Sequence, residues 1–280
     1  MTQENKIKTG LALGGGSALG FAHIGVLKAL QENNIQIDFI SGTSAGAIVG
    51  ALYAFGVSFE DIEKVAEKLD WKNVSKLRPC SMAIMSNKVL KGLLEENIGN
   101  VDISISKIPL AITCTDIETG AKVVFRSGNV VDAVLASSCL PGLFPPIEMQ
   151  GLMLVDGGIA ENVPISSLKD SECNVKIAVN LMRYRKYERP KNIIGVFMNS
   201  FDMINHRIST QPTKDDVDIL IEPDLRGYYM SDSAKWCEIS EKGYKETLKY
   251  IEKIKELQTQ KPTGEFWKNL KELLFNPNKQ

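Results

Sequence analysis

Histidine is scarce in this chain, since only His23 and His206 occur among its 280 residues. Acid–base catalysis near neutral pH most often uses histidine, so such a role here would fall to one of these two. His23 lies in an expected helix, where a packed or capping role is the ordinary interpretation. His206 lies in a polar stretch typical of the solvated surface. The scarcity of histidine therefore leaves two candidates for acid–base chemistry, and neither stands in a context that favours this role.

Cysteine is sparse as well, and its spacing carries no pattern. The five cysteines are odd in number and none stands in C-x-x-C spacing, which argues against a disulfide framework and against a zinc site. We expect no metal and no organic cofactor. The formal net charge of −1 provides no broad basic field, so nucleic acid is not an expected partner.

Long apolar runs are also missing. No stretch approaches the ~20 apolar residues that a membrane-spanning helix needs, and the polar segment Met1–Thr9 lacks the apolar core of a signal peptide. The sequence therefore predicts a cytoplasmic protein. Contact with a membrane would then be transient and confined to its surface. Assembly into an oligomer is compatible with the sequence.

The most informative stretch that is present is Gly42-Thr43-Ser44-Ala45-Gly46. It follows the apolar run 35–40 and precedes a helical stretch rich in small residues. This is the context of a G-x-S-x-G nucleophile elbow, in which a strand enters a tight turn, the serine is lifted out of the sheet and a helix leads away. Gly42 and Gly46 are expected where a side chain would collide with neighbouring backbone. Ser44 is therefore the candidate nucleophile.

A second motif, Gly14-Gly15-Gly16, lies between an expected strand over 7–13 and an expected helix over about 18–33. The backbone N–H groups of such a loop can converge on an anion at the start of a helix. The anion would be a phosphate or the oxyanion of an acyl-transfer intermediate. The loop matches neither the P-loop pattern nor, in register, G-x-G-x-x-G, so a phosphate- or nucleotide-binding module is the weaker alternative.

A third motif, Asp156-Gly157-Gly158, follows the apolar run 151–155. An aspartate at the end of a strand, followed by two glycines, leaves its carboxylate open to a neighbouring side chain. Because histidine is so scarce, Asp156 is the candidate that would replace it as the base of Ser44. A Ser-His-Asp hydrolase that uses His23 or His206 is the alternative hypothesis.

The glycine loop, the G-x-S-x-G elbow and the D-G-G motif, in this order, resemble the patatin-like phospholipase family. Supporting stretches are 21–27, 136–146 and 156–164. The resemblance covers about residues 7–181 and continues faintly to about 258. In that family a Ser–Asp dyad hydrolyses acyl esters of lipids without a histidine, and the glycine loop forms the oxyanion hole.

Carried over to this chain, the resemblance implies that Ser44 is the nucleophile and Asp156 the general base. It implies further that Gly14, Gly15 and Gly16 form the oxyanion loop. Two positions depart from the family pattern, because Ser17 stands where the common loop has a fourth glycine and Leu19 stands where it has a basic residue. Backbone N–H groups are present at both positions, so an oxyanion hole is still expected.

Strand patterns alternate with helical patterns along the chain, which predicts a three-layer α/β/α fold with a mainly parallel central sheet. Catalytic residues at the carboxyl ends of strands fit that architecture. Ser58 and Asn129 are expected to start helices, and a long helix is expected to reach about Leu257. We assign residues 7–258 to a catalytic domain and residues 259–280 to an amphipathic C-terminal extension.

Three segments are candidates for contact with lipid. The irregular segment 71–87 is a candidate lid over an acyl pocket or an ordinary loop. The segment 182–191 mixes basic and aromatic residues, which suits anionic headgroups or solvent. In the C-terminal extension one helical face is expected to pack against protein or a bilayer surface, and it consists of Phe266, Trp267, Leu270, Leu273 and Leu274.

The sequence therefore predicts a serine hydrolase that cleaves lipid-like acyl esters through an acyl-enzyme. Its class would be phospholipase A, lysophospholipase or general esterase. A catalytically weak family member that binds lipid or acyl groups is a further alternative, which the departure at Leu19 keeps open.

Overall fold

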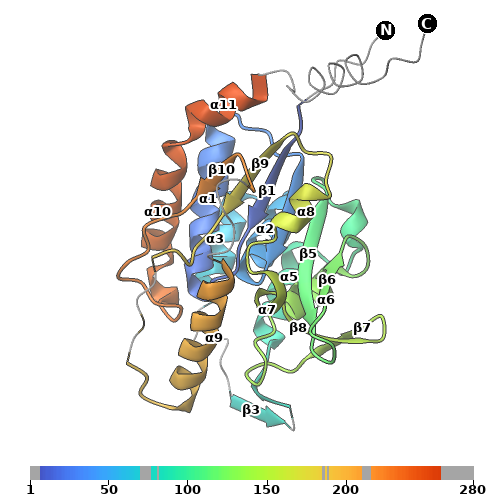
Figure 1. Cartoon of the computed structure of the whole chain (residues 1–280). Helices are drawn as coiled ribbons and strands as arrows, with labels where there is room; N and C mark the ends of the chain where they lie inside the picture. Colours follow the sequence, from blue (N-terminus) through green and yellow to red (C-terminus); the bar gives the residue numbers. More distant parts are fainter. Residues whose placement is uncertain are drawn as a thin grey trace, which may run out of the picture.

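An eight-stranded sheet runs through the centre of the protein, with helices on both sides (Figure 1). The computed structural model describes residues 7–69, 77–80, 82–184, 187, 189–209 and 216–259. Five strands lie side by side and run parallel, in the order β10 (Ile219–Ile221), β9 (Val175–Val179), β1 (Thr9–Leu13), β2 (Phe39–Thr43) and β5 (Leu110–Asp116). The predicted three-layer fold with a mainly parallel sheet is confirmed.

Three antiparallel strands complete the sheet and make it mixed. They are β6 (Lys122–Phe125), β7 (Ile147–Met149) and β8 (Leu152–Asp156). Strand β6 pairs with β5 over Ile112–Thr115, β8 pairs with β5 over Cys114–Asp116, and β7 pairs with β8. Because Cys114 and Thr115 already pair with β6 along one edge of β5, β8 must lie along the other edge, which β2 occupies up to Thr113. Strands β2 and β8 therefore approach each other end to end along one edge.

The two faces of the sheet carry side chains of different size. Along β1, Leu11 and Leu13 belong to the larger apolar core, and Ala12 between them belongs to a smaller one. Ala111 in β5 and Ala178 in β9 repeat this pattern. Because side chains alternate between the faces of a strand, the larger residues of these strands point to one layer of helices and the alanines to the other.

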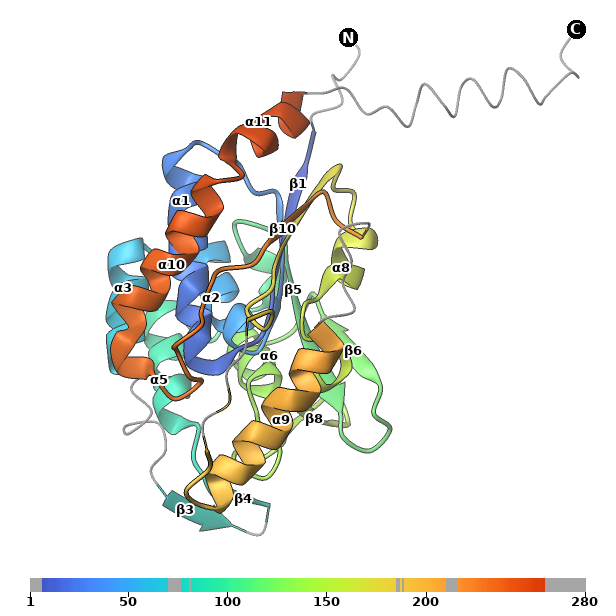
Figure 2. The ribbon, with the colours of Figure 1, turned by 60° about the vertical axis from the view of Figure 1, so that its left-hand side comes forward.

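The face with the larger side chains is covered by most of the helices, as Figure 2 shows from the side. These are α1 (Ala22–Glu32), α2 (Ala45–Ala54), α3 (Phe59–Lys68), α5 (Lys88–Asn97), α6 (Val130–Ser137), α10 (Trp236–Leu248) and α11 (Ile251–Thr259). Helices α8 (Ile165–Lys169) and α9 (Ile193–Ser209) lie on the opposite side, and α7 (Gly158–Glu161) follows β8. Single turns of 3₁₀ helix are η1 (Ser17–Phe21), η2 (Ile103–Ile105) and η3 (Ser233–Lys235).

The predicted helix starts are confirmed at Ser58 and Asn129, whose side chains accept hydrogen bonds from the backbone N–H of Asp61 and Asp132. The predicted continuous helix to about Leu257 is wrong. Helix α10 ends at Leu248, and α11 starts again at Ile251 after Lys249 and Tyr250. Both parts bury apolar residues in the larger core, so the break lets the chain follow the curved surface of the domain.

The candidate lid over 71–87 falls partly outside the described residues. Its described part contains a second, two-stranded sheet of β3 (Leu77–Cys80) and β4 (Ala83–Met85). Met85 is buried in a third apolar cluster with Leu140, Phe144 and Phe201. Residues 260–280, with the predicted apolar face of the extension, also lie outside the described residues, so that expectation stays a prediction. Within the described part of the chain, no helix is both long and apolar enough to cross a bilayer.

The close packing on the alanine face of the sheet can be tested by substitution. Ala178 is fully buried next to Ala12 in the neighbouring strand, so Ala178→Leu would force a larger side chain into a filled space. We expect a loss of about 1–3 kcal/mol in the free energy of unfolding, measured by urea denaturation. Ala121→Leu, at an exposed position, is the matched control and should change stability by no more than about 0.5 kcal/mol. Equal effects of the two substitutions would contradict this account.

Candidate active site

Ser44 occupies the turn between β2, which ends at Thr43, and α2, which begins at Ala45. Its backbone has φ 53° and ψ −122°, a conformation that costs a non-glycine residue on the order of 1–3 kcal/mol. The surrounding structure holds it there, because the N–H of Ser44 donates to Ser137 Oγ at 2.9 Å and its carbonyl accepts from Ala47 N and Ile48 N. The predicted strand-turn-helix context of the elbow is confirmed.

The glycines of the elbow allow the backbone of α2 to approach the end of β1. A Cβ on Gly46 would lie 2.1 Å from the carbonyl oxygen of Leu13, and a Cβ on Gly42 would lie 2.7 Å from the Cα of Ala47. Both distances are too short for non-bonded heavy atoms, and the obstacles are backbone atoms that cannot move aside. Glycine is therefore required for the elbow to sit against the sheet.

Asp156 ends β8, where it pairs with Cys114, one residue beyond the Thr43–Thr113 pair that ends β2. Ser44 Oγ donates a hydrogen bond to Asp156 Oδ2 at 2.7 Å. The N–H of Gly158 donates to Asp156 Oδ1 at 2.8 Å. The two candidate residues meet because their strands converge on one edge of β5 from opposite directions. Asp156 thus reaches the site from an antiparallel strand, not from one of the parallel strands.

The carboxyl of Asp156 is almost fully buried, with 1% of its surface exposed. Burial raises its pKa to about 6, against the opposing effect of the hydrogen bonds from Ser44 and Gly158. The neighbouring thiols of Cys114 and Cys139 are affected as well, because burial and the nearby Asp156 carboxylate both raise their pKa, that of Cys139 to about 12. Near neutral pH the site therefore combines an ionised carboxylate with neutral thiols.

The glycine loop lies directly beside Ser44, and the N–H groups of its three glycines have different roles. Gly14 N–H donates to Val179 O at 3.1 Å, and Gly15 N–H donates to Asn162 O at 3.0 Å. Among the hydrogen bonds of the described residues, none uses the N–H of Gly16 or of Ser17. A Cβ on Gly15 would lie 3.1 Å from Ser44 Cβ, so the loop and the elbow are in contact.

Among the hydrogen bonds of the described residues, none joins either histidine to Ser44. His23 is fully buried, and its Nε2 lies 2.7 Å from the carbonyl oxygen of Gly14. Burial lowers its pKa to about 4, so the ring is neutral and Nε2–H donates to that carbonyl. The packed role expected for His23 is confirmed. His206 was expected in a solvated irregular stretch, and this is wrong, because it lies half-buried in α9 with Nδ1 3.1 Å from the Tyr187 hydroxyl.

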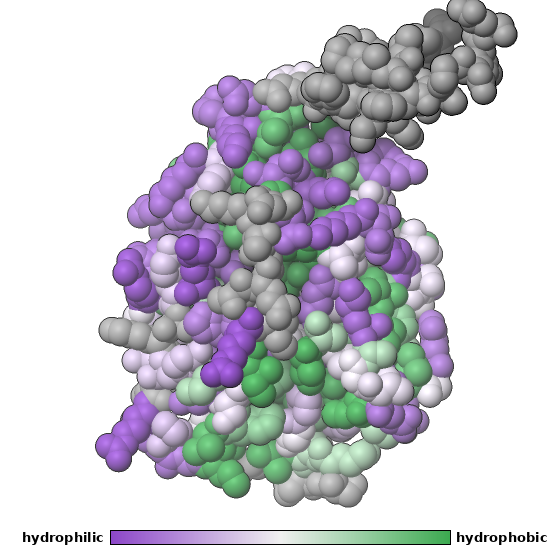
Figure 3. All heavy atoms as spheres, viewed as in Figure 1, coloured by the Kyte–Doolittle hydropathy of each residue, from purple (hydrophilic) through white to green (hydrophobic). Residues whose placement is uncertain are grey.

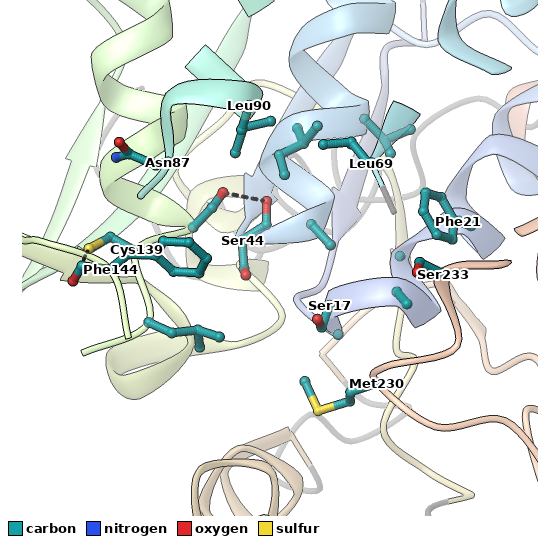
Figure 4. Close-up of a pocket in the computed structure, with 18 of the residues that line it drawn as sticks. Ser17, Phe21, Ser44, Leu69, Asn87, Leu90, Cys139, Phe144, Met230 and Ser233 are labelled. Atoms are coloured by element: carbon teal, nitrogen blue, oxygen red, sulfur yellow. Dashed lines mark hydrogen bonds between the residues drawn. The ribbon is translucent and has the colours of Figure 1, made fainter. Parts of the chain in front are cut away.

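Ser44 opens into a cavity of about 130 Å³, shown in Figure 4. Gly16 and Ser17 of the loop line it together with Ala45 of the elbow. Most of the other lining side chains are apolar and include Phe21, Ile48, Leu69, Leu90, Leu140, Phe144, Phe201 and Met230. A cavity of this size and lining accommodates a small apolar group. The site therefore presents a hydroxyl, a carboxylate and free N–H groups at the end of an apolar slot.

Several lining residues carry no signal in the sequence. Phe201 and Asn205 come from α9, and Asn87 precedes α5. Asn87 is the N-cap residue of α5, yet its side chain makes no capping hydrogen bond, and its buried Nδ2 has no partner among the residues that the structure describes. The hydroxyl of Ser86, one residue earlier, accepts a hydrogen bond from Lys88 N at 3.4 Å. Only the tertiary structure brings these residues to Ser44.

Comparison with known proteins gives three findings. The family model described as patatin-like phospholipase matches residues 11–169. An uncharacterized NTE family protein of Mycobacterium tuberculosis is 34% identical over 178 residues, which cover 62% of this chain and 49% of that protein. Lysophospholipase NTE1 of Candida glabrata is 32% identical over 229 residues, which cover 79% of this chain and 13% of that protein. The chain thus spans half or less of the length of these relatives.

The solved structure of VipD from Legionella pneumophila is similar in fold. It superposes with a TM-score of 0.53 at 15% sequence identity, covering 89% of this chain and 67% of that one. The likeness in architecture therefore extends beyond the residues that the family model matches.

The burial of the Asp156 carboxyl leads us to expect that stability depends on pH. The pKa of Asp156 is about 6 in the folded protein, whereas the ordinary value is 3.8. Between these two pH values, folding is therefore accompanied by uptake of a proton. Stability is therefore lost as the pH rises from about 4 through 6, and above pH 6 the ionised form costs roughly 3 kcal/mol. We expect Asp156→Asn to be more stable than wild type at pH 8, by up to that amount, and nearly equal to it at pH 4.

Urea denaturation at the two pH values measures this difference. Asp170→Asn, which removes an exposed carboxylate, is the control and should show no comparable gain. The account is wrong if Asp156→Asn is no more stable than wild type at pH 8.

Proposed function

The chain belongs to the patatin-like phospholipase family, and from that premise we propose that it is a serine hydrolase of lipid-like acyl esters. The observation that carries the proposal is the 2.7 Å hydrogen bond from Ser44 Oγ to Asp156 Oδ2 at the end of an apolar cavity. It joins a nucleophile to an acceptor for its proton without a histidine. Neither a metal nor an organic cofactor has a part in the proposed reaction.

In the first half of the reaction, Ser44 Oγ attacks the ester carbonyl and its proton passes to Asp156 Oδ2. The tetrahedral intermediate then collapses, the C–O bond to the alcohol breaks, and Asp156 returns the proton to the leaving oxygen. In the second half, Asp156 takes a proton from water, which attacks the carbonyl carbon of the acyl-enzyme. The bond between Ser44 Oγ and the acyl carbon then breaks, Asp156 returns the proton to Ser44 Oγ, and the fatty acid leaves. A carboxyl pKa of about 6 makes Asp156 a stronger base than an ordinary carboxylate, whose pKa is near ~4.

Oxyanion stabilisation is assigned to the loop Gly14–Gly16. Within it, the N–H of Gly16 is free to donate to the oxyanion, and those of Ser17 and the cavity-lining Ala45 can act with it. Gly14 and Gly15 contribute by fixing the loop through their hydrogen bonds to Val179 and Asn162. Each donor of this kind is worth about 2.7–4 kcal/mol in the transition state. Leu19 is fully buried in the larger core, so this position adds no positive charge and the stabilisation comes from backbone dipoles.

The hydrogen bonds that the N–H groups of Gly14 and Gly15 donate within the fold also weaken the alternative of a phosphate- or nucleotide-binding module. A phosphate cradle needs several convergent N–H groups, whereas two of the three glycine N–H groups here point into the fold. The apolar lining of the cavity favours an acyl chain instead. We therefore infer a phospholipid, a lysophospholipid or a simpler acyl ester as substrate, met from the aqueous side at a membrane surface.

The nucleophile is tested by Ser44→Ala. Since no other group in the proposed mechanism can form the acyl-enzyme, we expect hydrolysis of p-nitrophenyl butyrate and of lysophosphatidylcholine to fall by at least about a thousandfold. A fluorophosphonate probe should label the wild type at Ser44 only. Ser138→Ala, which alters another hydroxyl of the cavity, is the control for labelling. Labelling at a different serine, or full turnover by the alanine variant, refutes the assignment, and a wild type that binds lipid without turnover supports the alternative of a weak, lipid-binding member.

The base is tested by Asp156→Asn, which keeps the size of the side chain but cannot accept the proton. We expect a loss nearly as large as for Ser44→Ala, and no further loss in the double variant, because the two residues act as one unit. For the wild type, kcat/KM should be level above about pH 6 and fall below it, as the carboxylate with its pKa of about 6 takes up a proton. His206→Ala should retain activity, and a dead histidine variant beside an active Asp156→Asn would point to a triad.

A further inference from the structure

Helix α9 carries large apolar side chains on its outer face. Ile193 is 83% exposed, Val196 and Ile204 are each 52% exposed, and Met203 is 45% exposed. Together with Ser200 and Arg207, which are also exposed, these positions follow helical spacing and form one stripe along the helix. Exposed apolar residues that occur singly need no explanation, but four of them on one face of one helix indicate a surface that is covered in use.

The inner face of the same helix is part of the active site. Phe201 is buried among Leu140, Phe144 and Met85, and it lines the cavity of Ser44 together with Asn205. One helix therefore forms both a wall of the cavity and an apolar outer surface. Figure 3 shows hydrophobic side chains gathered on the lower part of the molecule, where α9 lies in Figure 1.

The charges along α9 are distributed in a way that suits a negatively charged interface. Between Ile193 and Asn205 the only charged residue is Asp202, and it is 2% exposed. Exposed basic residues stand at both ends of the stripe, Arg189 and Lys191 before it and Arg207 near the end of the helix. An apolar stripe with basic residues near its ends, and no exposed carboxylate between Ile193 and Asn205, is complementary to acyl chains below a layer of anionic headgroups.

We propose that this stripe, Ile193, Val196, Met203 and Ile204, seats the protein on the surface of an anionic lipid bilayer. The apolar side chains enter the boundary between headgroups and acyl chains, and the basic ends contact the headgroups. This proposal rests on the proposed function. Docking through the stripe would bring the wall of the Ser44 cavity to the membrane layer that holds lipid substrates.

A second copy of the chain fits the stripe less well than a bilayer does. Four side chains on one helix cover much less than the ~800 Å² per partner that a stable interface buries. A copy packed on the stripe in antiparallel fashion would also bring the basic ends of the two helices together. A bilayer has no such size requirement, and its anionic headgroups neutralise both ends at once.

The test compares two double variants of the full-length chain, both in a Ser44→Ala background so that the vesicles stay intact. Ile193→Asn with Ile204→Asn alters the stripe without changing net charge. Ile105→Asn with Leu248→Asn alters two other exposed apolar residues, which are 64% and 43% exposed, and is the matched control. Binding is measured by flotation with vesicles of phosphatidylcholine and phosphatidylglycerol in equal parts, and the melting temperature and solution mass of each variant are recorded.

We expect the stripe variant to bind vesicles at least about tenfold more weakly than the parent, and the control to bind within about twofold of it. Replacing phosphatidylglycerol by phosphatidylcholine should weaken binding of the parent, and Arg207→Gln should reduce that dependence. If the stripe variant has a lowered melting temperature, Val196→Asn with Met203→Asn replaces it. The proposal is overturned if the parent does not bind vesicles, if both double variants lose binding equally, or if only the stripe variant changes solution mass, which would assign the stripe to a second copy.

The proposed function is measured separately with wild type and water-soluble p-nitrophenyl butyrate. Vesicle binding without turnover of this ester would refute the enzyme and retain the docking surface. Turnover of this ester without vesicle binding would retain the enzyme and refute the docking surface.

Discussion

The hydrogen bond between Ser44 and Asp156 depends on an unusual meeting of two strands. Strand β2 runs along one edge of β5 as far as Thr113, and β8 takes over that edge at Cys114 from the opposite direction. Ser44, which follows the end of β2, thereby faces Asp156, the last residue of β8. Other contacts maintain this meeting, since Ser137 Oγ accepts from Ser44 N and donates to Thr113 O. A Cβ on Gly157 would lie 2.1 Å from that same carbonyl oxygen, so the turn after Asp156 also fits only with glycine.

The burial that raises the pKa of Asp156 also opposes folding. An aspartate that is 1% exposed and has no cation beside it in the contacts described loses hydration when it ionises, and two hydrogen bonds replace only part of that hydration. The positive φ of Ser44 adds a second local cost. Both are offset by the extensive apolar core on the larger face of the sheet. Strain of this kind at an active site, supported by a well-packed surrounding, is common in enzymes.

Much of the site could be predicted from sequence because its key residues belong to local motifs. The turn at Ser44 and the strand end at Asp156 each need only a few consecutive residues, and glycines mark both. The direction of β8 could not be read in this way, because a short apolar run has no polarity and its partner is chosen by the whole sheet. Nor could the hydrogen bonds of Gly14 and Gly15 be predicted, since Val179 and Asn162 lie far along the chain. Phe201 and Asn205 of α9 were missed for the same reason, and the break between α10 and α11 depends on how these helices pack on the domain.

The position of β1 in the middle of the sheet has a consequence for how the chain folds during synthesis. Strand β1 is made before the other strands of the sheet, but one of its two neighbours is β9. Beside this pairing, Lys8 N donates a hydrogen bond to Asn174 Oδ1 across 166 positions of the chain. Until that part of the chain has been made, one edge of β1 has no partner within its own domain and can pair with another chain. Contacts of such long sequence separation also slow folding. Nascent or truncated chains that stop before Val175 should therefore be the forms most prone to aggregate and most in need of chaperones.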